Sequence, residues 1–381
     1  MDTLNQNKAP VRVLHVVTNM SYGGLENLLM SYYRQIDRTK VQFDFLTHFA
    51  DHQDFEEEIS ALGGKLYRLP RLNPVSRFYQ QALDAFFSEH REYRIVHSHL
   101  DCMAAVPLMA AQRAGIPVRI AHSHTSNQRH NWKYPIKLFW RSRIPAYATE
   151  LFACGKAAGD WMFQGRPYRM LHNAVCAEEF QYDPARAAAV RKELDVENRL
   201  VIGHVGQFRA EKNHVFLVRI FGALLKKCPD AVLLLVGKGS TMQEAKACAE
   251  DLGILDHIRF LGARADISSI LQAVDVFVLP SLYEGIPVTV IEAQSAGIPC
   301  IVSDHVPMEC AVTDLVCQQS LEDAPDVWAD TILAKAKRGR VRTLPQIRAS
   351  GFDIGSNALA LQKFYMEADH SGDTHGIHTG L

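Results

Sequence analysis

Short apolar runs alternate with longer amphipathic segments along almost the whole chain, and the alternation starts afresh halfway. The strands expected in the first half are Val11–Val17, Gln42–Leu46, Lys65–Arg68, Ile95–Ser98, Val118–Ala121 and Leu151–Ala153. Those expected in the second half are Val201–Val205, Ala231–Val236, Ile258–Leu261, Val274–Leu279 and Cys300–Val302. Strands that alternate with helices build parallel sheets. The pattern therefore predicts an α/β fold with two Rossmann-like, doubly wound parallel-sheet domains.

A charged, alanine-rich stretch at 183–198 separates the two halves and contains no expected strand. We place the boundary there, with an N-terminal domain at 1–185 and a C-terminal domain at 186–369. A chain of 381 residues is long enough for two such cores. We expect the last helix, at about 355–369, to pack back on the N-terminal domain. Residues 370–381 are too polar to bury a core and are expected to be disordered.

Composition narrows the class of protein. The net charge of −1 gives no general attraction to nucleic acid. The 8 cysteines form no CxxC pair and no Cys/His cluster at zinc spacing, which suits a reducing compartment. No signal-peptide core opens the chain, and no apolar run approaches the roughly 18 residues that span a bilayer. We therefore expect a cytoplasmic protein.

Residues 284–299 carry the most specific pattern in the chain, and they lie between two expected strands. A turn at Glu284-Gly285, followed by a helix that opens at Pro287, would leave helix amides unpaired at a strand's carboxyl end. Such amides favour an anion. Glu292 falls on the apolar stripe of this helix, where a carboxylate needs a partner. That partner is either a buried Lys or Arg or a ligand.

Other candidates follow strands elsewhere, where open α/β sheets bind their ligands. They are Gly23, Gly24, Gln207, Arg209, Lys212, Gly237, Lys238 and Arg264. The glycines would let backbone approach a ligand, and Arg209 and Lys212 would neutralise a diphosphate. Arg264 would stack on a nucleobase. Ordinary turns and solvated loop charges are the alternative interpretation of each.

Histidines end two strands of the first half, at His99 and at His122 and His124. A histidine in such a place binds a substrate hydroxyl or assists proton transfer, although a structural role is the commoner one. If the strand continues through 121–125, we expect His122 and His124 to point to opposite faces. Only one of them would then face the ligand, and His122 is preferred.

These motifs together resemble a known family. Glu284, seven further residues and Glu292, followed by Ala-Gly-Ile-Pro at 296–299, look like the signature of retaining glycosyltransferases of family 4, which have the GT-B fold. The segments that match in order and spacing are Gly23-Gly24, Asn173, the loop with Arg209 and Lys212, and Phe260-Leu261-Gly262. The likeness covers residues 11–368. The 122–124 region looks most like members that build bacterial exopolysaccharide or capsule.

The resemblance implies two domains facing a central cleft, with a nucleotide-diphosphate sugar, expected to be a UDP-sugar, held mainly by the C-terminal one. Glu284 would hold hydroxyls of the donor sugar, and Glu292 those of the nucleotide ribose. Arg209 and Lys212 would stabilise the departing diphosphate, so that neither metal nor cofactor is needed. The remaining positions implied in donor binding are Gly23, Gly24, Gln207, Gly237, Lys238, Arg264, Gly285, Ile286, Pro287, Val288 and Thr289.

On the acceptor side, the resemblance implies a glycan, expected to be lipid-linked. His122 is nominated for a contact with the sugar or the acceptor hydroxyl, and His99 and His124 for the acceptor side. One departure from the family stands in the 206–212 loop. The family usually has Arg directly after the glycine, where this chain has Gln207, and we expect Arg209 to replace it.

The stretch 128–147 contains five basic residues, no acidic one, and interleaved aromatic residues. Basic and aromatic residues together suit an anionic membrane surface. The sequence therefore predicts peripheral binding at the inner face of the plasma membrane. The alternative is a helix whose aromatic side chains pack in the N-terminal domain.

Two other functions stay open at this point. UDP-sugar 2-epimerases share the two-domain architecture, but they need acid and base groups around the sugar and release it free. A catalytically silent protein that binds a sugar nucleotide is the other, because Gln207 departs from the family. A dehydrogenase is disfavoured, since no strand is followed by GxGxxG.

Overall fold

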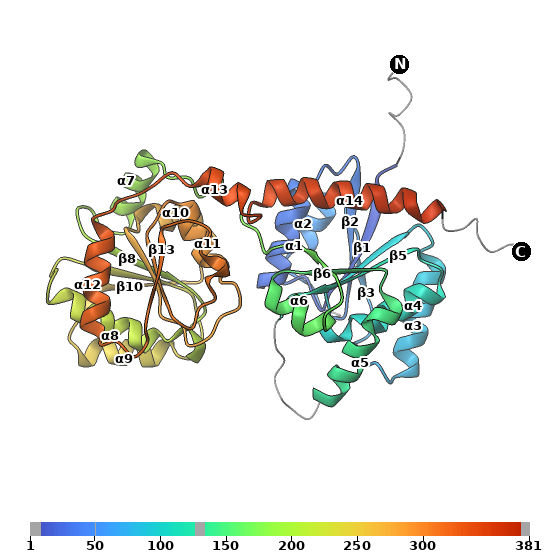
Figure 1. Ribbon diagram of the computed structural model, residues 1–381, viewed down its shortest axis with the longest axis horizontal. Coiled ribbons are helices and arrows are strands. Elements are labelled where there is room, and N and C mark those ends of the chain that lie inside the picture. The colour runs from blue at the N-terminus through green and yellow to red at the C-terminus, as the bar shows by residue number, and fades with distance from the viewer. Residues whose placement is uncertain (1–8, 50, 126–133, 375–381) are drawn as a thin grey trace, which may run out of the picture. The chain divides into compact units, whose positions relative to one another are not determined.

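The computed structural model describes residues 9–49, 51–125 and 134–374, which form two compact units (Figure 1). Unit 1 consists of the chain up to Asn173 together with the residues from Ile354 onward, and unit 2 spans Ala174–Asp353. The division falls after Asn173 instead of near residue 185. The reason is that Val175, Ala177 and Phe180 pack into the core of unit 2.

Unit 1 contains a parallel sheet of 7 strands in the order β3-β2-β1-β4-β5-β6-β7. The strands are β1 (Val11–Val16), β2 (Val41–Thr47), β3 (Leu66–Arg68), β4 (Ile95–Ser98), β5 (Val118–Ser123), β6 (Glu150–Ala153) and β7 (Arg169–Met170). All six strands predicted for the first half are present. The sequence missed β7, a two-residue edge strand with no apolar run.

The helices of unit 1 are α1 (Gly24–Gln35), α2 (Glu56–Ala61), α3 (Arg77–Glu89), η1 (Asp101–Ala104), α4 (Ala105–Arg113), α5 (Tyr134–Tyr147), α6 (Lys156–Phe163) and α14 (Ile354–Thr374). Helices α1 and α14 pack together over one face of the sheet (Figure 1). The opposite face forms an apolar core with α3, α4, α5 and α6. Helix α14 includes residues 370–374, which the sequence placed in a disordered tail, and residues 375–381 lie outside the described part.

Unit 2 contains a parallel sheet of 6 strands in the order β10-β9-β8-β11-β12-β13. The strands are β8 (Val201–Val205), β9 (Val232–Val236), β10 (Ile258–Gly262), β11 (Val276–Leu279), β12 (Cys300–Ser303) and β13 (Val316–Gln319). The five predicted strands are present. The sequence missed β13, whose outer position leaves it only half-buried and whose residues are partly polar.

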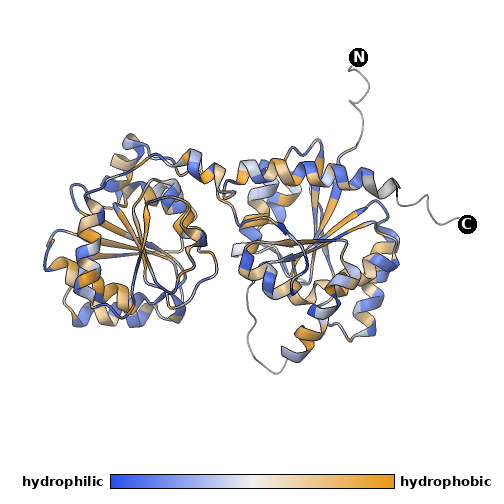
Figure 2. Ribbon diagram, viewed as in Figure 1, coloured by the Kyte–Doolittle hydropathy of each residue, from blue (hydrophilic) through white to orange (hydrophobic). Residues whose placement is uncertain are grey.

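The helices of unit 2 are α7 (Pro184–Glu193), η2 (Ala210–Lys212), α8 (His214–Leu225), α9 (Met242–Asp251), η3 (Leu255–His257), α10 (Ile267–Ala273), α11 (Val288–Ser295), η4 (Met308–Cys310), α12 (Pro325–Ala336) and α13 (Leu344–Ala349). One face of the sheet forms its core with α7, α10, α11 and α13, and the other with α8, α9 and α12. Figure 2 shows that the strands are mostly apolar and that the helices around them have mixed hydropathy. Within the described ranges, no helix is long and apolar enough to cross a bilayer.

Each sheet has one point where its strand order reverses. In unit 1 this switch lies between β1 and β4, and in unit 2 between β8 and β11. The connections that leave these neighbouring strands diverge, which opens a crevice at the carboxyl ends. The loops after β8 and β11 are therefore the place to look for a ligand site in unit 2.

Backbone contacts bind the loops after β8 and β9 to each other and to the end of β10. The amide of Gly206 donates to Val236 O at 2.9 Å, that of Phe208 to Lys238 O at 3.0 Å, and that of Gly237 to Gly262 O at 2.8 Å. Gly237 has φ +144°, and a Cβ there would overlap the carbonyl of Gly206. Only glycine fits this close approach.

Gly237→Ala should therefore destabilise unit 2 by about 2 kcal/mol, because it adds both backbone strain and a clash with backbone. The measurement is chemical denaturation followed by circular dichroism. Gly24→Ala is the control, since a Cβ at Gly24 meets nothing within 4 Å. Equal stability of the two variants would show that the 206–208 and 237–239 loops are not packed as described.

Candidate active site at the carboxyl edge of unit 2

A largely buried ion pair joins the loops that follow β8 and β11, at the carboxyl edge of the sheet. Lys212 Nζ lies 2.6 Å from Glu284 Oε1, and the two side chains are only 20% and 11% exposed. Ser281 Oγ donates to the same carboxylate oxygen at 2.7 Å. The amide of Leu282 donates to Glu211 O at 2.7 Å, which fixes the backbone of one loop against the other. Two predicted site residues, 72 positions apart in the chain, thus meet at the switch point of the sheet.

Local backbone explains how Lys212 reaches this position. Loop residues 210–212 form the short 3-10 turn η2, and Asn213 then takes a left-handed conformation, φ +55°, before α8 begins. A Cβ on Gly206 would lie 3.3 Å from both Cδ and Cε of Lys212. The glycine after β8 therefore leaves room for the lysine stem to lie across it.

Helix α11 follows Glu284 and points its first turn at the same edge. Pro287 does not occupy the first helical position that the sequence predicted. Its ψ of 104° is extended, so it is the cap residue and the helix begins at Val288. The amide of Val290 donates to Pro287 O at 3.0 Å, whereas those of Val288 and Thr289, at the very start of the helix, have no carbonyl within the helix to reach. Thr289 Oγ1 is buried, and no partner for it is found among the described residues.

Glu292 lies one turn further along α11 and is half-buried. Burial raises the pKa of this carboxyl from 4.5 to about 7. Within the described ranges no Lys or Arg forms an ion pair with it, and its pKa shift has no cause other than burial. The salt bridge that was one interpretation of its position is therefore absent from the described structure. Its carboxylate is available to a ligand.

The other predicted donor-side residues differ in what surrounds them. Gln207, Arg209 and Lys238 are exposed at the same edge. Arg264, by contrast, forms a two-point contact with Asp266, at 2.7 and 2.6 Å, and would have to give it up to stack on a base. Gly285 and Ile286 lead directly into α11.

The glycine pair of unit 1 serves its own helix. Gly24 begins α1, and Gly23 is the cap residue. The carboxylate of Glu26 occupies the space where a Cβ of Gly23 would stand. Burial raises the pKa of Glu26. The space beside Gly23, which was expected to admit a ligand, is thus filled by a side chain from the first turn of α1.

The prediction that His122 and His124 point to opposite faces is wrong. Their ring centroids are 4.1 Å apart, because side chains two positions apart on a strand share a face. His99 Nδ1 lies 2.9 Å from His124 Nε2. His122 is 3% exposed and His99 4%, so neither ring reaches the surface of unit 1.

Two further histidines stand beside Lys212 and were missed by the sequence analysis. His204 on β8 is fully buried, with Nδ1 2.9 Å from Val278 O. His214 begins α8 and stacks on Phe208 with centroids 3.9 Å apart. Burial and the charge of Lys212 lower the pKa of His214 to about 4. The rule applied to histidines at strand ends in the first half would have selected His204.

The basic and aromatic stretch is described only in part, since residues 128–133 lie outside the described ranges. In α5, Ile136 is 42% and Phe139 50% exposed, and the guanidinium of Arg143 lies 5.0 Å from the Phe139 ring. Arg141 instead lies over Trp161 at 4.7 Å, and Trp140 packs against the apolar core. Helix α5 thus has one face packed in unit 1, as one interpretation expected, and one face exposed, for which contact with a membrane stays a prediction.

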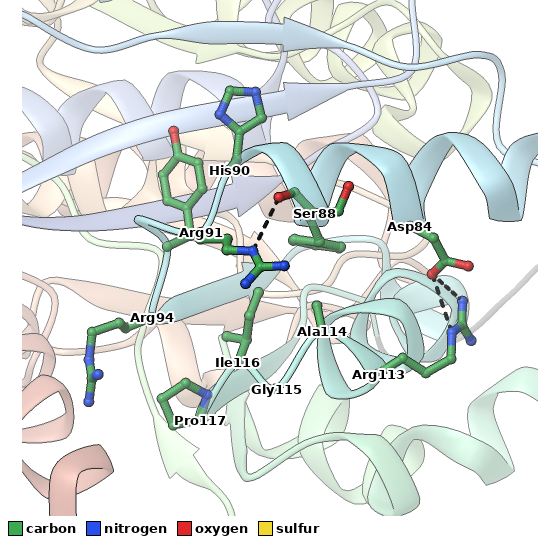
Figure 3. A pocket seen from close by; sticks show the side chains of 12 residues that line it. Asp84, Ser88, His90, Arg91, Arg94, Arg113, Ala114, Gly115, Ile116 and Pro117 are labelled. Carbon is green, nitrogen blue, oxygen red and sulfur yellow. Dashed lines mark hydrogen bonds and ion pairs between the residues drawn. The ribbon is translucent and has the colours of Figure 1, made fainter.

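A hollow of about 620 Å³ lies elsewhere in unit 1, between the end of α3 and the loops that precede β4 and β5 (Figure 3). Arg91, Arg94 and Arg113 line it, and Arg113 pairs with Asp84 at 2.6 Å. None of the predicted site residues is among those that line it. It lies at the amino ends of the strands, opposite to the edge where α/β sheets bind substrates.

Known proteins resemble both units. Residues 22–179 match the family model described as Glycosyltransferase Family 4, and residues 186–333 match that described as Glycosyl transferases group 1. EpsF of Bacillus subtilis (strain 168), named as a glycosyltransferase, is 36% identical over 387 residues, which cover 96% of this chain and 100% of EpsF.

Two further relatives are more distant. The Escherichia coli UDP-Gal:alpha-D-GlcNAc-diphosphoundecaprenol alpha-1,3-galactosyltransferase is 30% identical over 251 residues, covering 58% of this chain and 60% of that protein. The crystal structure of Anabaena Alr3699/HepE in complex with UDP superposes with a TM-score of 0.71 at 18% identity, covering 96% of this chain and 98% of that one. At that identity the likeness establishes the fold alone. Both sheets are the Rossmann-like domains of the GT-B fold.

Glu292→Gln should stabilise the protein at high pH. Because the pKa is raised on folding, the buried charge does not lower the stability of the protein below about pH 4.5. The loss of stability grows as the pH rises and reaches its full size above about pH 7. We expect the variant to gain about 1–3 kcal/mol at pH 8.5 and much less at pH 5.5. Thermal unfolding of wild type and variant at both pH values measures this. The exposed Glu197→Gln is the control, and a gain independent of pH would contradict the assignment.

Proposed function

This chain belongs to glycosyltransferase family 4, and from that premise we propose that it is a retaining, metal-independent enzyme that transfers a sugar from a UDP-sugar to a lipid-linked glycan acceptor. The product belongs to bacterial exopolysaccharide or capsule synthesis. UDP is supported by the HepE complex, which shares the fold and holds that nucleotide. A lipid-linked acceptor is supported by the relative whose name specifies a diphosphoundecaprenol substrate.

The observation that carries the proposal is the Lys212–Glu284 pair at the switch point of the unit 2 sheet. A cation, a carboxylate and the first amides of α11 lie together at the carboxyl edge of the sheet. A sugar diphosphate requires this set of groups. The diphosphate is negative and matches Lys212 and the helix amides. The sugar carries hydroxyls, and these match a carboxylate.

Donor binding would exchange partners within this set. Without ligand, Lys212 and Glu284 neutralise each other at 2.6 Å. A diphosphate that takes Lys212 releases Glu284 Oε1 to accept hydrogen bonds from sugar hydroxyls, while Ser281 keeps that carboxylate in place. Lys212 then stabilises the charge that develops on the leaving diphosphate, which is the step where fixed cations accelerate transfer most. Exposed Arg209 supplies a second positive charge. It replaces the arginine that the family has at the position of Gln207.

Glu292 holds the nucleotide ribose. Its carboxylate is half-buried and unpaired within the described part of the chain, and ribose hydroxyls would donate to it. Binding of the ribose would recover some of the free energy that burial of this group costs. Glu292 and Glu284 therefore act on different parts of the donor, so substitutions at the two should separate affinity for UDP from turnover.

The acceptor side is proposed at the membrane. Exposed Ile136, Phe139 and Arg143 of α5 suit the interface of an anionic bilayer, where a lipid-linked acceptor would lie. The enzyme would then act as a peripheral protein at the cytoplasmic face. His99, His122 and His124 are buried or half-buried, and we assign them no contact with the reacting sugar.

The proposal is tested by incubating the protein with labelled UDP-sugars and a lipid-diphosphate-linked glycan. Transfer of label to the lipid, with the anomeric configuration kept, is the expected result. Release of an epimerised free sugar would indicate the epimerase instead. Binding without turnover would indicate a silent sugar-nucleotide-binding protein. A preliminary thermal-shift screen of nucleotide sugars selects the donor, because a bound ligand stabilises the folded state.

Lys212→Ala should lower kcat at least tenfold, because a charge-assisted contact to the leaving diphosphate is worth roughly 1.5 kcal/mol or more. Lys227→Ala is the matched control, since Lys227 pairs with Asp330 on α12, away from this edge. Steady-state kinetics with the selected donor provides the comparison. A Lys212→Ala enzyme that keeps kcat within about threefold would overturn the diphosphate assignment.

Replacing Phe139 and Arg143 together, as Phe139→Ser with Arg143→Glu, should reduce binding to anionic vesicles about tenfold or more, because both an apolar contact and a positive charge are lost. Cosedimentation with vesicles containing phosphatidylglycerol measures it, and higher salt should weaken the wild type. Phe78→Ser is the control, since Phe78 is 68% exposed on α3. Binding that responds neither to the double substitution nor to salt excludes this surface.

A further inference from the structure

Five histidines gather on one face of the unit 1 sheet, although they come from three separate strands. His15 lies on β1, His97 on β4 and His122 on β5, and His99 and His124 follow the ends of β4 and β5. The strands β1, β4 and β5 are neighbours, and His15 pairs in register with His97. All but the half-buried His124 are less than 5% exposed.

The cluster lines a small space beneath α1 and α14. The cavity measures about 10 Å³, and its remaining walls are the apolar and aromatic side chains Leu28, Leu29, Tyr32, Phe43, Leu171, Leu361 and Tyr365. A volume of this size admits one small particle, such as a water molecule or an ion. The space is part of unit 1 alone, because α14 belongs to that unit.

Several ring nitrogens around this space have no partner. Among the described residues, none is found for His15 Nε2, His97 Nε2 or either nitrogen of His122. A buried polar atom left without a partner costs about 1–3 kcal/mol. A bound ion or water molecule would supply a partner to such an atom, and His97 Nε2 is the one of the four that belongs to the ligand set proposed below.

The protonation of the cluster suits a cation as the occupant. Burial lowers the pKa of His15 and His124 to about 3, and lowers the pKa of the other three well below the ordinary value. Histidine, with an ordinary pKa of about 6.5, is mostly uncharged at neutral pH even without this shift, so the rings offer lone pairs. Neutral imidazole is the form of histidine that binds metals.

We propose that His15, His97 and His99 bind one divalent transition-metal ion of the zinc class. One ring nitrogen of each lies within 4.8 Å of the others. His15 Nδ1 and His99 Nε2 are 3.0 Å apart, which is hydrogen-bond distance and also close to the separation of about 3.3 Å that two ligands of a tetrahedral zinc ion have. An all-nitrogen donor set selects zinc, nickel or copper over magnesium or calcium.

Tyr365 supplies the outer contact that a histidine ligand needs. Its hydroxyl lies 2.7 Å from His97 Nδ1, which leaves His97 Nε2 as the nitrogen without a partner. Such contacts orient the ring and fix the tautomer of metal-binding histidines. The ion would tie β1 and β4 to each other under α14, at the switch point of the sheet. Its role is structural, and the sugar transfer proposed above does not depend on it.

The ion is tested in protein produced without a polyhistidine tag in medium supplemented with zinc chloride. Elemental analysis after dialysis against a weak chelator should find about one zinc per chain. Growth with cobalt chloride should instead give the visible absorption of a tetrahedral cobalt site. Less than about 0.1 equivalent of either metal in folded protein overturns the proposal and leaves a water molecule as the occupant.

Variants identify the ligands. His97→Gln and His15→Gln should each lose at least nine-tenths of the metal, and Tyr365→Phe, which keeps the packing, should weaken binding about 10- to 100-fold. The double variant His375→Ala, His378→Ala and the exposed-site variant His52→Ala should retain it. Circular dichroism checks the fold of each.

Other results of the same series would contradict the assignment. Loss of metal only in the tail variant would place it on the terminal histidines. Loss only on His122→Gln would move it to the neighbouring group formed by His99, His122 and His124. If His97→Gln fails to fold, the folded Tyr365→Phe variant still decides the question, because an unchanged metal affinity in it would exclude His97 as a ligand.

Discussion

The contact between Lys212 and Glu284 joins the two loops that leave the unit 2 sheet on either side of its switch point. Everything proposed about the reaction depends on it, because it brings a cation and a carboxylate to the start of α11. The arrangement rests on backbone that only small residues allow. Gly206 leaves room for the lysine stem, and Gly237 lets the next loop pack against it. The ion pair therefore depends on how the loops pack at the carboxyl edge of the parallel sheet.

The same edge shows a conflict between stability and binding. Glu292 is held half-buried without a partner among the described residues, and burial of its carboxylate raises its pKa because the charged form is disfavoured there. His204 and His214 are likewise buried close to Lys212, and ring nitrogens of both have no partner in the part of the chain that the structure describes. A folded protein retains such groups where a ligand satisfies them or a function requires them. In the proposed enzyme, the nucleotide ribose is that ligand for Glu292.

Much of this structure could be predicted from the sequence. Eleven of its strands are apolar runs between amphipathic segments, and Glu284 and Lys212 were recognisable from spacing; the strands without such runs, β7 and β13, were missed. The order and register in which the strands pair could not be predicted from the sequence. His15, His97 and His122 stand in unrelated segments, and only the pairing of β1, β4 and β5 brings them together. A search for metal ligands by spacing along the chain cannot find a cluster of this kind. The error over His122 and His124 had a simpler cause, since strand geometry already places both on one face.

Hydrogen–deuterium exchange with and without UDP tests the central claim most directly, because it locates the nucleotide without assuming a donor sugar or an acceptor. The account predicts slower exchange in peptides that cover residues 206–212 and 281–292, since both loops and the first turn of α11 would contact the ligand. Protection confined to residues 84–117, around the arginine-lined hollow of unit 1, would contradict it.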